Sequence, residues 1–299
     1  MFTDVRILQK LSIFFFCATL GVRTTLQILS DLHLESPKGY DIFEITPCTP
    51  YLALLGDIGN VVEHEAEFLA FLTAQLRKFR AVLFVPGNHE AYNSSWPKTL
   101  SILRAFEQSV STDSMLGAFI LLDCAVFRFP DTSIAVLGCS LFSCVPPESQ
   151  AAVGTGLNDF FLTDKWDVAA HNAAHARDVA WLNAQVAELE EIGIDAVAIL
   201  THWSPTQDAR LAEPRHATSQ ITSGFSTDLS GEQCFKSRVV TVWAFGHTHY
   251  NCDFTVQRED GAGPLRLVTN QRGYYSAQAE RFDGTKTVDV RARDSSSVA

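Results

Sequence analysis

Short apolar runs separated by polar stretches recur along this 299-residue chain. Five of them are nearly free of charge and cover residues 26–30, 51–56, 81–85, 196–200 and 239–245. Apolar runs of this length are typical of buried β-strands rather than of helices. Two further runs, residues 118–123 and 133–139, predict strands in the middle of the chain.

Helical spacing of apolar residues marks two longer segments. Residues 63–80 predict a helix with one buried face, formed by Phe68, Leu69, Leu72, Leu76 and Phe79. Because this helix joins two of the strands, it predicts a strand-helix-strand unit with parallel pairing. Residues 165–192 predict a second helix with apolar positions Val168, Ala169, Ala176, Val179, Trp181, Leu182 and Val186. Residues 146–158 and 204–233, which are rich in turn-forming residues, are expected to be loops.

Metal-binding side chains follow each of the first five runs within a few residues. They are Asp31 and His33, then Asp57, then Asn88 and His89, then His202, and last His247 and His249. Ligands of α/β sheets gather at the carboxyl ends of the strands, so these side chains are expected to share one polar site. The pattern indicates a metal-dependent hydrolase.

Composition is that of a globular protein and argues against non-specific binding of nucleic acid. With 46% apolar and 19% charged residues, the chain can bury a large core as one domain or a tightly fused pair. The formal net charge of the chain is −11. A protein that binds nucleic acid needs a basic face to neutralise the phosphates, and this acidic composition does not indicate one. A small substrate whose charge is met by metal ions fits this balance better.

The seven cysteines are an odd number without a repeating spacing, which makes a disulfide framework unlikely in so long a chain. Cys139 and Cys144 form the only close pair, and no second pair exists to complete a zinc site. Free thiols and a reducing compartment are therefore expected.

The N-terminus is ambiguous. Residues 11–22 are apolar behind Arg6 and Lys10, as in a secretory signal, but the segment is too short to span a bilayer and lacks an Ala-x-Ala cleavage site. Cleavage after Gly21 would leave only four residues before the first strand. We expect residues 1–24 to be a non-cleaved N-terminal extension, or the product of a misplaced start codon, in a cytoplasmic protein without a membrane span. Secretion is the alternative.

The segments SDLHLE, LLGDIGN, FVPGNHEAY, LTHWSP and FGHTHYN resemble, in this order, the five motif blocks of calcineurin-like metallophosphoesterases. Each block alone is a weak signal, but five in the right order are specific. The resemblance implies an α/β fold, a four-layer α/β/β/α sandwich of two mixed sheets with helices outside. It places this domain at residues 25–290 and leaves residues 291–299 as a flexible tail.

Carried over block by block, the resemblance implies a centre of two divalent metal ions, with Asp57 as the bridging ligand. One ion is expected on Asp31, His33 and His249, and the other on Asn88, His202 and His247. Manganese, iron or zinc suits such nitrogen and oxygen ligands. A water shared by the two ions would attack the phosphorus of a small phosphorylated substrate. Gly56, Gly87 and Gly246 are expected to let the backbone turn tightly beside the ligands.

His89 is not needed as a ligand, and the family resemblance implies that it is the general acid for the leaving oxygen. Many relatives carry Asp at the position of Asn60, where the carboxylate orients the catalytic histidine. We therefore expect the Asn60 amide to accept the same hydrogen bond from the His89 ring without supplying charge.

Two departures from other branches narrow the substrate. Phosphoprotein phosphatases carry Asp-Arg-Gly at the end of the second block, whereas this chain reads GDIGNVV. Purple acid phosphatases place an iron-binding tyrosine at the position of Asn60. A small phosphomonoester or phosphodiester is the expected substrate.

The residues that select the substrate are less clearly marked. His171 and His175 lie four apart on one face of the predicted helix 165–192, at the pocket mouth or on a solvated face. Arg272 could reach a phosphate, with a surface position as the alternative. Asn172, Asp164, Phe225 and residues 158–160 are further candidates.

Two other functions remain open at this point. A catalytically silent scaffold of the same fold would have no reason to keep every metal ligand and His89, all of which are present. A nuclease would need a basic groove, which the acidic composition does not indicate.

Overall fold

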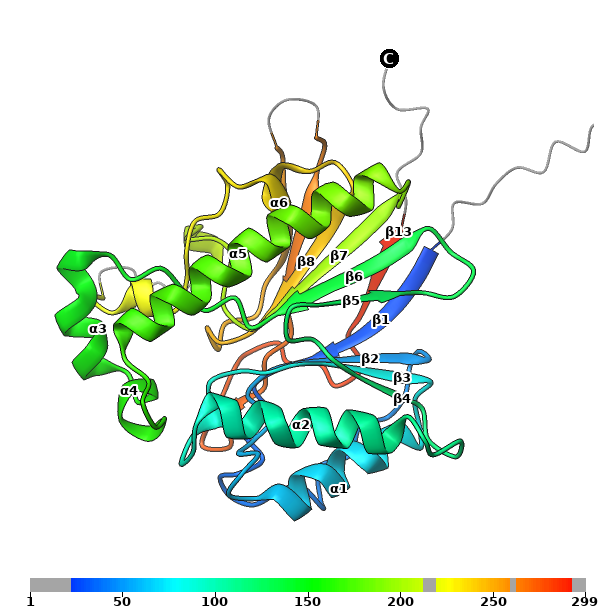
Figure 1. Cartoon of the computed structure of the whole chain (residues 1–299), viewed down its shortest axis with the longest axis horizontal. Coiled ribbons are helices and arrows are strands. Elements are labelled where there is room, and N and C mark those ends of the chain that lie inside the picture. Colours follow the sequence, from blue (N-terminus) through cyan, green and yellow to red (C-terminus); the bar gives the residue numbers. More distant parts are fainter. Residues whose placement is uncertain (1–22, 212–218, 259–261, 292–299) are drawn as a thin grey trace, which may run out of the picture.

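The computed structural model describes residues 23–211, 219–258 and 262–291 (Figure 1). The expected N-terminal extension and C-terminal tail lie almost wholly outside these residues, as does Cys17. Within the described part of the chain, no helix combines the length and apolar character needed to cross a membrane.

The first sheet has five strands in the order β13-β1-β2-β3-β4. These are β1 (Arg23–Leu29), β2 (Tyr51–Leu55), β3 (Ala81–Val85), β4 (Ala118–Leu121) and β13 (Thr287–Arg291). Strands β1 to β4 run parallel, and β13 pairs antiparallel with β1 at the edge. Parallel pairing aligns the carboxyl ends of β1, β2 and β3 along one border of the sheet.

The second sheet has six strands in the order β5-β6-β7-β8-β10-β9. They are β5 (Ala125–Arg128), β6 (Ile134–Cys139), β7 (Ala196–Thr201), β8 (Val240–Phe245), β9 (Asp253–Val256) and β10 (Leu265–Thr269). The four central strands are parallel, and both edge strands are antiparallel. A small hairpin, β11 (Gly273–Tyr274) with β12 (Ala277–Gln278), follows β10.

Helices cover the outer faces of both sheets (Figure 1). The first sheet carries α1 (Glu65–Leu76) and α2 (Trp96–Val110), and the second carries α5 (Val168–Glu191) and α6 (Gln233–Lys236). Two short helices, α3 (Gln150–Gly156) and α4 (Asp159–Leu162), lie to one side. Short 3₁₀ segments are η1 (His89–Ala91), η2 (Pro147–Ser149), η3 (Ala209–Leu211) and η5 (Thr222–Gly224).

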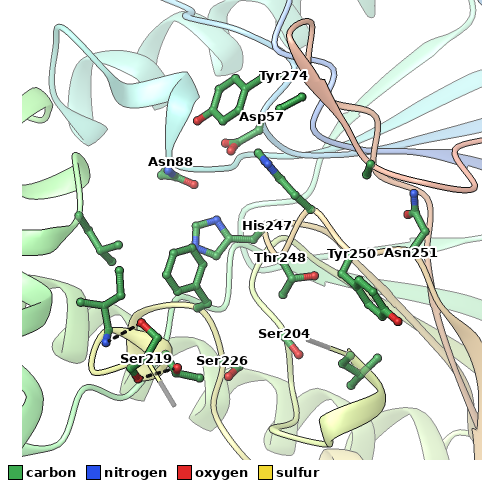
Figure 2. A pocket seen from close by; sticks show the side chains of 18 of the residues that line it. Asp57, Asn88, Ser204, Ser219, Ser226, His247, Thr248, Tyr250, Asn251 and Tyr274 are labelled. Atoms are coloured by element: carbon green, nitrogen blue, oxygen red, sulfur yellow. Dashed lines mark hydrogen bonds between the residues drawn. The ribbon is translucent and has the colours of Figure 1, made fainter. Parts of the chain in front are cut away.

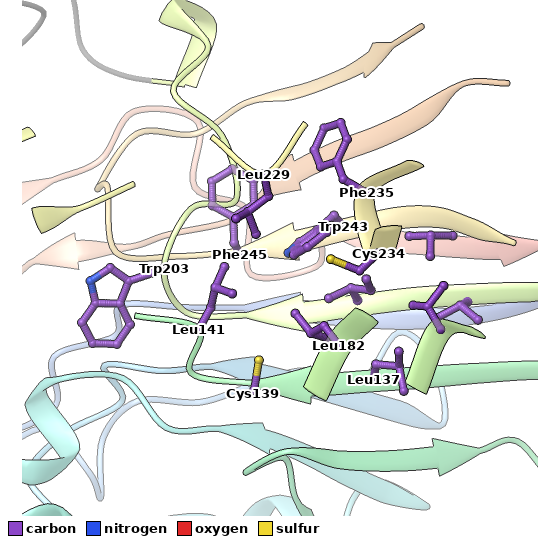
Figure 3. Packing of buried hydrophobic residues seen from close by; sticks show 14 of the residues in the cluster. Leu137, Cys139, Leu141, Leu182, Trp203, Leu229, Cys234, Phe235, Trp243 and Phe245 are labelled. Atoms are coloured by element: carbon purple, nitrogen blue, oxygen red, sulfur yellow. The ribbon is translucent and has the colours of Figure 1, made fainter. Parts of the chain in front are cut away.

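Alternating side chains of the buried strands divide the core into layers. In β2, Leu52 and Leu54 pack with α1, whereas Ala53 and Leu55 face the second sheet. The strands of the second sheet alternate in the same way, and their outer face packs with α5 around residues such as Leu182 (Figure 3). Because both faces of each sheet are covered, the central strands β2, β3, β6 and β7 are apolar at almost every position. The expected four-layer sandwich is confirmed.

Most of the predicted elements are confirmed, including the parallel β2-α1-β3 unit. The six cysteines of the described residues are all free, as expected. The prediction of a loop over residues 146–158 is wrong, because α3 lies within it. Val153 of this helix packs with Val145 and Leu157 in a small apolar cluster, and this burial outweighs the helix-weakening effect of the two glycines.

The buried face of α5 is more polar than its sequence indicates. His171 and Asp178 are both 0% exposed, and His175 is buried beside them. Asp178 Oδ2 accepts a hydrogen bond from Leu141 N at 2.9 Å, and His171 Nε2 accepts one from Ser143 N at 3.0 Å. The placement of His171 at a pocket mouth or on a solvated face is therefore wrong, because this face of α5 binds the backbone that follows β6.

His171 should make the protein sensitive to acid. Burial lowers the pKa of its ring to about 3, and Nε2 already accepts a backbone N–H. Below pH 6.5, His171 is therefore protonated in the unfolded chain but stays neutral in the folded chain. This difference lowers the free energy of unfolding by about 1.4 kcal/mol for each pH unit. A His171→Gln variant keeps an acceptor for Ser143 N but cannot titrate.

Urea unfolding of the metal-free protein at pH 8, 6.5 and 5 tests this expectation. Between pH 6.5 and 5 the variant should lose about 2 kcal/mol less stability than the wild type. Equal losses would show that His171 binds its proton in the folded state.

Candidate metal centre

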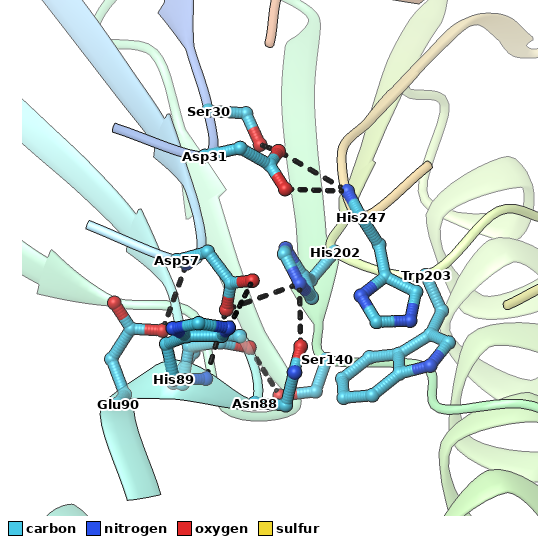
Figure 4. Close-up of polar contacts among 12 residues, drawn as sticks. Ser30, Asp31, Asp57, Asn88, His89, Glu90, Ser140, His202, Trp203 and His247 are labelled. Atoms are coloured by element: carbon cyan, nitrogen blue, oxygen red, sulfur yellow. Dashed lines mark hydrogen bonds and ion pairs between the residues drawn. The ribbon is translucent and has the colours of Figure 1, made fainter. Parts of the chain in front are cut away.

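Seven side chains from the two sheets converge where the sheets' carboxyl ends meet. Figure 4 labels Asp31, Asp57, Asn88, His202 and His247 among them. The first sheet supplies Asp31 and His33 after β1, Asp57 after β2 and Asn88 after β3, and the second supplies His202 after β7 and His247 and His249 after β8. The loops are linked across the interface, because His247 N donates to Asp31 Oδ2 at 3.1 Å. The structure thus brings together the seven side chains that are expected to bind the two ions.

Left-handed backbone directs most of these side chains inward. Asp31, His33, Asp57, His247 and His249 have φ between 47° and 69°. Non-glycine residues adopt this region at a cost, about 1 kcal/mol or more for each, and such residues cluster at functional sites. In residues 31–33 (the D-x-H segment) and residues 247–249 (the H-x-H segment), the first and third residues have this conformation, and their side chains face the same site.

The first candidate metal group comprises Asp31, His33, Asp57 and His249, and one ligand atom of each lies within 4.8 Å of the others. His33 Nε2 and His249 Nε2 are 3.0 Å apart, and His249 Nε2 lies 3.2 Å from Asp31 Oδ1. Their lone pairs face one common space when the rings are unprotonated. That geometry suits a cation better than a ring-to-ring hydrogen bond.

The second group comprises Asp57, His202 and His247, whose ligand atoms also lie within 4.8 Å of one another. The Nε2 atom of His247 is buried without a hydrogen-bond partner among the described residues. A buried polar atom without a partner lowers the stability of the fold, and a metal ion at this site would be a partner for the nitrogen. Asp57 belongs to both groups, and the site therefore has room for two ions with one carboxylate between them.

Asn88 completes the second group. Its Oδ1 lies 3.1 Å from His202 Nε2, while its Nδ2 donates to Tyr92 Oη at 2.8 Å and to Asp159 Oδ1 at 2.9 Å. These two acceptors fix the amide so that its oxygen faces the site.

The charges of the site fit a cation centre. Burial raises the pKa of the Asp57 carboxyl, but the charges of His202 and His89 outweigh it and hold the pKa well below its usual range. Burial lowers the pKa of His247 well below its usual range, which keeps that ring neutral and able to ligate. Nitrogen and oxygen donors without thiolate suit manganese, iron or zinc.

Two glycines and one carboxylate hold the Asp57 loop in place. Gly56 has φ 86°, whereas at Gly87 the requirement is space, because a Cβ atom there would lie 2.6 Å from Asp57 N and 2.8 Å from His202 Cε1. The buried Glu90 carboxylate accepts hydrogen bonds from Asp57 N at 2.9 Å and Gly87 N at 2.6 Å. The loops after β2 and β3 are thereby held together.

His89 lies beside Asp57, but its hydrogen-bond partners differ from the expected ones. Its Nδ1 is 2.8 Å from Glu35 Oε1, and Asn60 Nδ2 donates instead to the His89 main-chain oxygen at 2.7 Å. The expected hydrogen bond between the Asn60 side chain and the His89 ring is therefore wrong. Burial lowers the pKa of His89, but Asp57 and Glu35 outweigh it and raise the pKa to about 9. Bound cations would oppose that shift.

Tyr274, which the motif pattern does not mark, covers the site from the β11–β12 hairpin. Its ring stacks on His33 at a centroid distance of 4.1 Å, and its hydroxyl lies 3.2 Å from His89 Nε2. The hairpin is tied to the centre because Gly273 N donates to Asp31 O at 3.0 Å. No periodicity in this short segment could have shown the contact.

A cavity of about 860 Å³ opens from the metal side chains (Figure 2). Asp57, Asn88 and Tyr274 lie at one end, and Ser204, Ser219 and Ser226 lie at the other. Three of the candidate substrate-selecting residues, Asn158, Asp159 and Phe225, line this cavity.

Arg272 does not line the large cavity. Its guanidinium donates to Leu32 O at 2.8 Å and lies over the Phe43 ring at 5.0 Å. Expectations that this arginine reaches a phosphate in the main pocket are wrong, because its side chain is held on the loop after β1.

Comparison with known proteins agrees with this geometry. The sequence model of the calcineurin-like phosphoesterase family matches residues 25–251. "Uncharacterized protein L509" of Acanthamoeba polyphaga mimivirus is 27% identical over 284 residues, which cover 89% of this chain and 96% of that protein. The crystal structure of phosphopantetheinyl hydrolase from Mycobacterium tuberculosis is similar in fold, with a TM-score of 0.61 and 17% identity over 85% of this chain and 91% of that one. The chain belongs to the calcineurin-like phosphoesterase family and is a phosphoric ester hydrolase.

Proposed function

We propose that this protein hydrolyses a small phosphomonoester or phosphodiester with the help of two divalent metal ions. Asp31, His33 and His249 would hold one ion, Asn88, His202 and His247 would hold the other, and Asp57 would be a ligand of both. The observation that carries this proposal is that the two candidate metal groups share Asp57.

Two divalent ions at such a site supply charge stabilisation of the phosphoryl oxygens and an activated water. The chain's own residues orient the participants. Asp159 and Tyr92 hold the Asn88 amide, Glu90 holds the Asp57 loop, and Leu55 O, 2.7 Å from His202 Nδ1, sets the ring so that Nε2 faces the centre.

His89 is the general acid in this proposal. It lines the cavity without belonging to either of the two metal groups that share Asp57, and its Nε2 lies 3.8 Å from Asp57 Oδ2. A proton held at Nε2 is therefore beside the place where a leaving oxygen departs from the two-ion centre.

The cavity favours an ester whose organic part is much larger than phosphate. Its volume of about 860 Å³ lies in the range that encloses whole small molecules. The wall beyond the metal side chains contains the neutral polar residues Ser204, Gln207 and Thr248 and the aromatic rings of Phe225 and Tyr250. Such walls suit a polar or aromatic group without several negative charges.

Chelation followed by metal addition tests the two-ion requirement. EDTA treatment should abolish hydrolysis of p-nitrophenyl phosphate and bis(p-nitrophenyl) phosphate, and Mn²⁺ should restore it at about two ions per chain, as measured by metal analysis. A panel of phosphomonoesters, cyclic nucleotides, other diesters and pyrophosphates would then define the substrate. Undiminished hydrolysis by a protein shown to be metal-free would refute the proposal.

Replacing Asp57 and replacing His89 should affect metal binding differently. Asp57→Ala should lose metal and activity together, because the carboxylate belongs to both groups. His89→Ala should keep both ions and lose about 10²- to 10⁴-fold in turnover of alkyl esters, with a much smaller loss for nitrophenyl esters, which need little protonation. If His89→Ala emptied the site, or slowed both kinds of ester equally, the general-acid role would be wrong.

A methyl group at Gly87 should disturb the centre although no ligand residue is replaced. Gly87→Ala pushes a Cβ atom against Asp57 and His202, so Mn²⁺ affinity should fall at least about tenfold, a loss typical of displaced ligand supports. Gly231→Ala is the matched control, because a Cβ atom there meets nothing within 4 Å. Isothermal titration with Mn²⁺ measures both. Unchanged affinity in Gly87→Ala would mean that the Asp57 loop is not fixed as described.

A further inference from the structure

Glu35 occupies a position that links a candidate ligand to the candidate general acid. It follows the D-x-H segment by two residues, at a tight turn in which Ser36 N donates to His33 O at 3.2 Å. Its Oε1 lies 2.8 Å from His89 Nδ1 and 3.3 Å from His33 Nδ1. The Glu35 side chain is only 9% exposed, so these contacts are shielded from water.

One carboxylate oxygen shared by two imidazoles fixes the orientation of both rings. A carboxylate oxygen accepts hydrogen bonds, so each ring must carry its proton on Nδ1. The Nε2 atom of His33 is then free to face His249 and the first ion. The Nε2 atom of His89 is directed toward Asp57 and the Tyr274 hydroxyl, on the cavity side.

No other carboxylate takes this place at His89 Nδ1 among the described contacts. The Asn60 amide donates to the His89 main-chain oxygen at 2.7 Å and does not contact the ring nitrogens. Asp57 approaches the ring from its other nitrogen, at 3.8 Å. The ring is thus held at Nδ1 by Glu35.

We propose that Glu35 is the positioning residue for His89 and for the ligand His33. This inference rests on the proposed function of the centre. Glu35 does not line the large cavity, and it acts by holding both rings with their Nε2 atoms toward the cavity and the first ion. Metal-ligating histidines commonly have such a carboxylate at their second nitrogen, and here one oxygen serves two rings.

The positioning role of Glu35 can be tested by measuring the hydrolysis of esters with good and poor leaving groups by three variants. Glu35→Ala should slow hydrolysis of an alkyl phosphate about 10- to 100-fold more than hydrolysis of its nitrophenyl counterpart, because only the former needs an aligned acid. Glu35→Gln keeps an oxygen acceptor and should recover most of that difference. Glu67→Gln is the matched control, since this exposed carboxylate binds Lys38 on the same loop and lies outside the site.

Nitrogen-15 NMR of histidine-labelled, metal-free protein gives a readout that does not depend on activity. In the wild type and in Glu35→Gln, His33 and His89 should both carry a proton on Nδ1, and in Glu35→Ala this preference should disappear. Spectra of His33→Gln and His89→Gln variants assign the two signals. An unprotonated Nδ1 of His89 in the wild type would overturn the proposal.

Metal analysis separates positioning from ligation. Glu35→Gln should retain two ions per chain, and a fall to one would show that Glu35 is itself a ligand and would overturn the proposed role. If the wild type binds metal and hydrolyses esters while Glu35→Ala shows no leaving-group effect, only the positioning role fails. If the wild type binds no metal, the proposed function fails, and the NMR measurement still decides whether Glu35 holds His89.

Discussion

Burial of two carboxylates at one sheet border is the constraint on which the rest of this structure depends. Asp31 and Asp57 follow neighbouring parallel strands and lie in the interior, where burial acts to raise the pKa of both carboxyls and the charge of Asp57 adds to this effect at Asp31. Charge of the opposite sign must be supplied nearby, since an unpaired buried carboxylate is costly. The second sheet provides part of that compensation through the charges of His249 and His202, which lower the pKa of Asp31. Bound cations would complete it.

Backbone groups hold the carboxylates before any metal does. Asp31 accepts a hydrogen bond from His247 N, and Asp57 Oδ1 accepts one from His89 N at 2.9 Å. Glu90 in turn accepts the main-chain N–H groups of the Asp57 loop. This framework balances the cost of the left-handed residues, because each strained loop is bonded to a loop from another strand. Metal ions can therefore enter a preformed site rather than organise one.

The sequence allows the fold and the strand-end side chains to be predicted because both depend on short-range patterns. Buried parallel strands are continuous apolar runs, and their carboxyl ends must meet, so the amino-acid order alone places residues as distant as Asp31 and His247 together. Features that depend on tertiary contacts could not be predicted from such short-range patterns. The polar face of α5 is one, since nothing local shows that His171 accepts a main-chain N–H after β6. Tyr274 is another, 185 residues from its partner His89.

The role of Glu35 was only partly predictable from the sequence. It stands inside a recognisable block, SDLHLE, but its role follows only when the turn after His33 and the start of η1 are seen together. An imidazole can be held at Nδ1 by any loop that reaches it, so the positioning carboxylate is not bound to one place in the sequence. A second carboxylate at position 60 would face the His89 main-chain oxygen that the Asn60 amide now satisfies, and the two acceptors would repel each other. Asn60 and Glu35 are thus a matched pair: the amide fixes the His89 backbone, and the carboxylate fixes its ring.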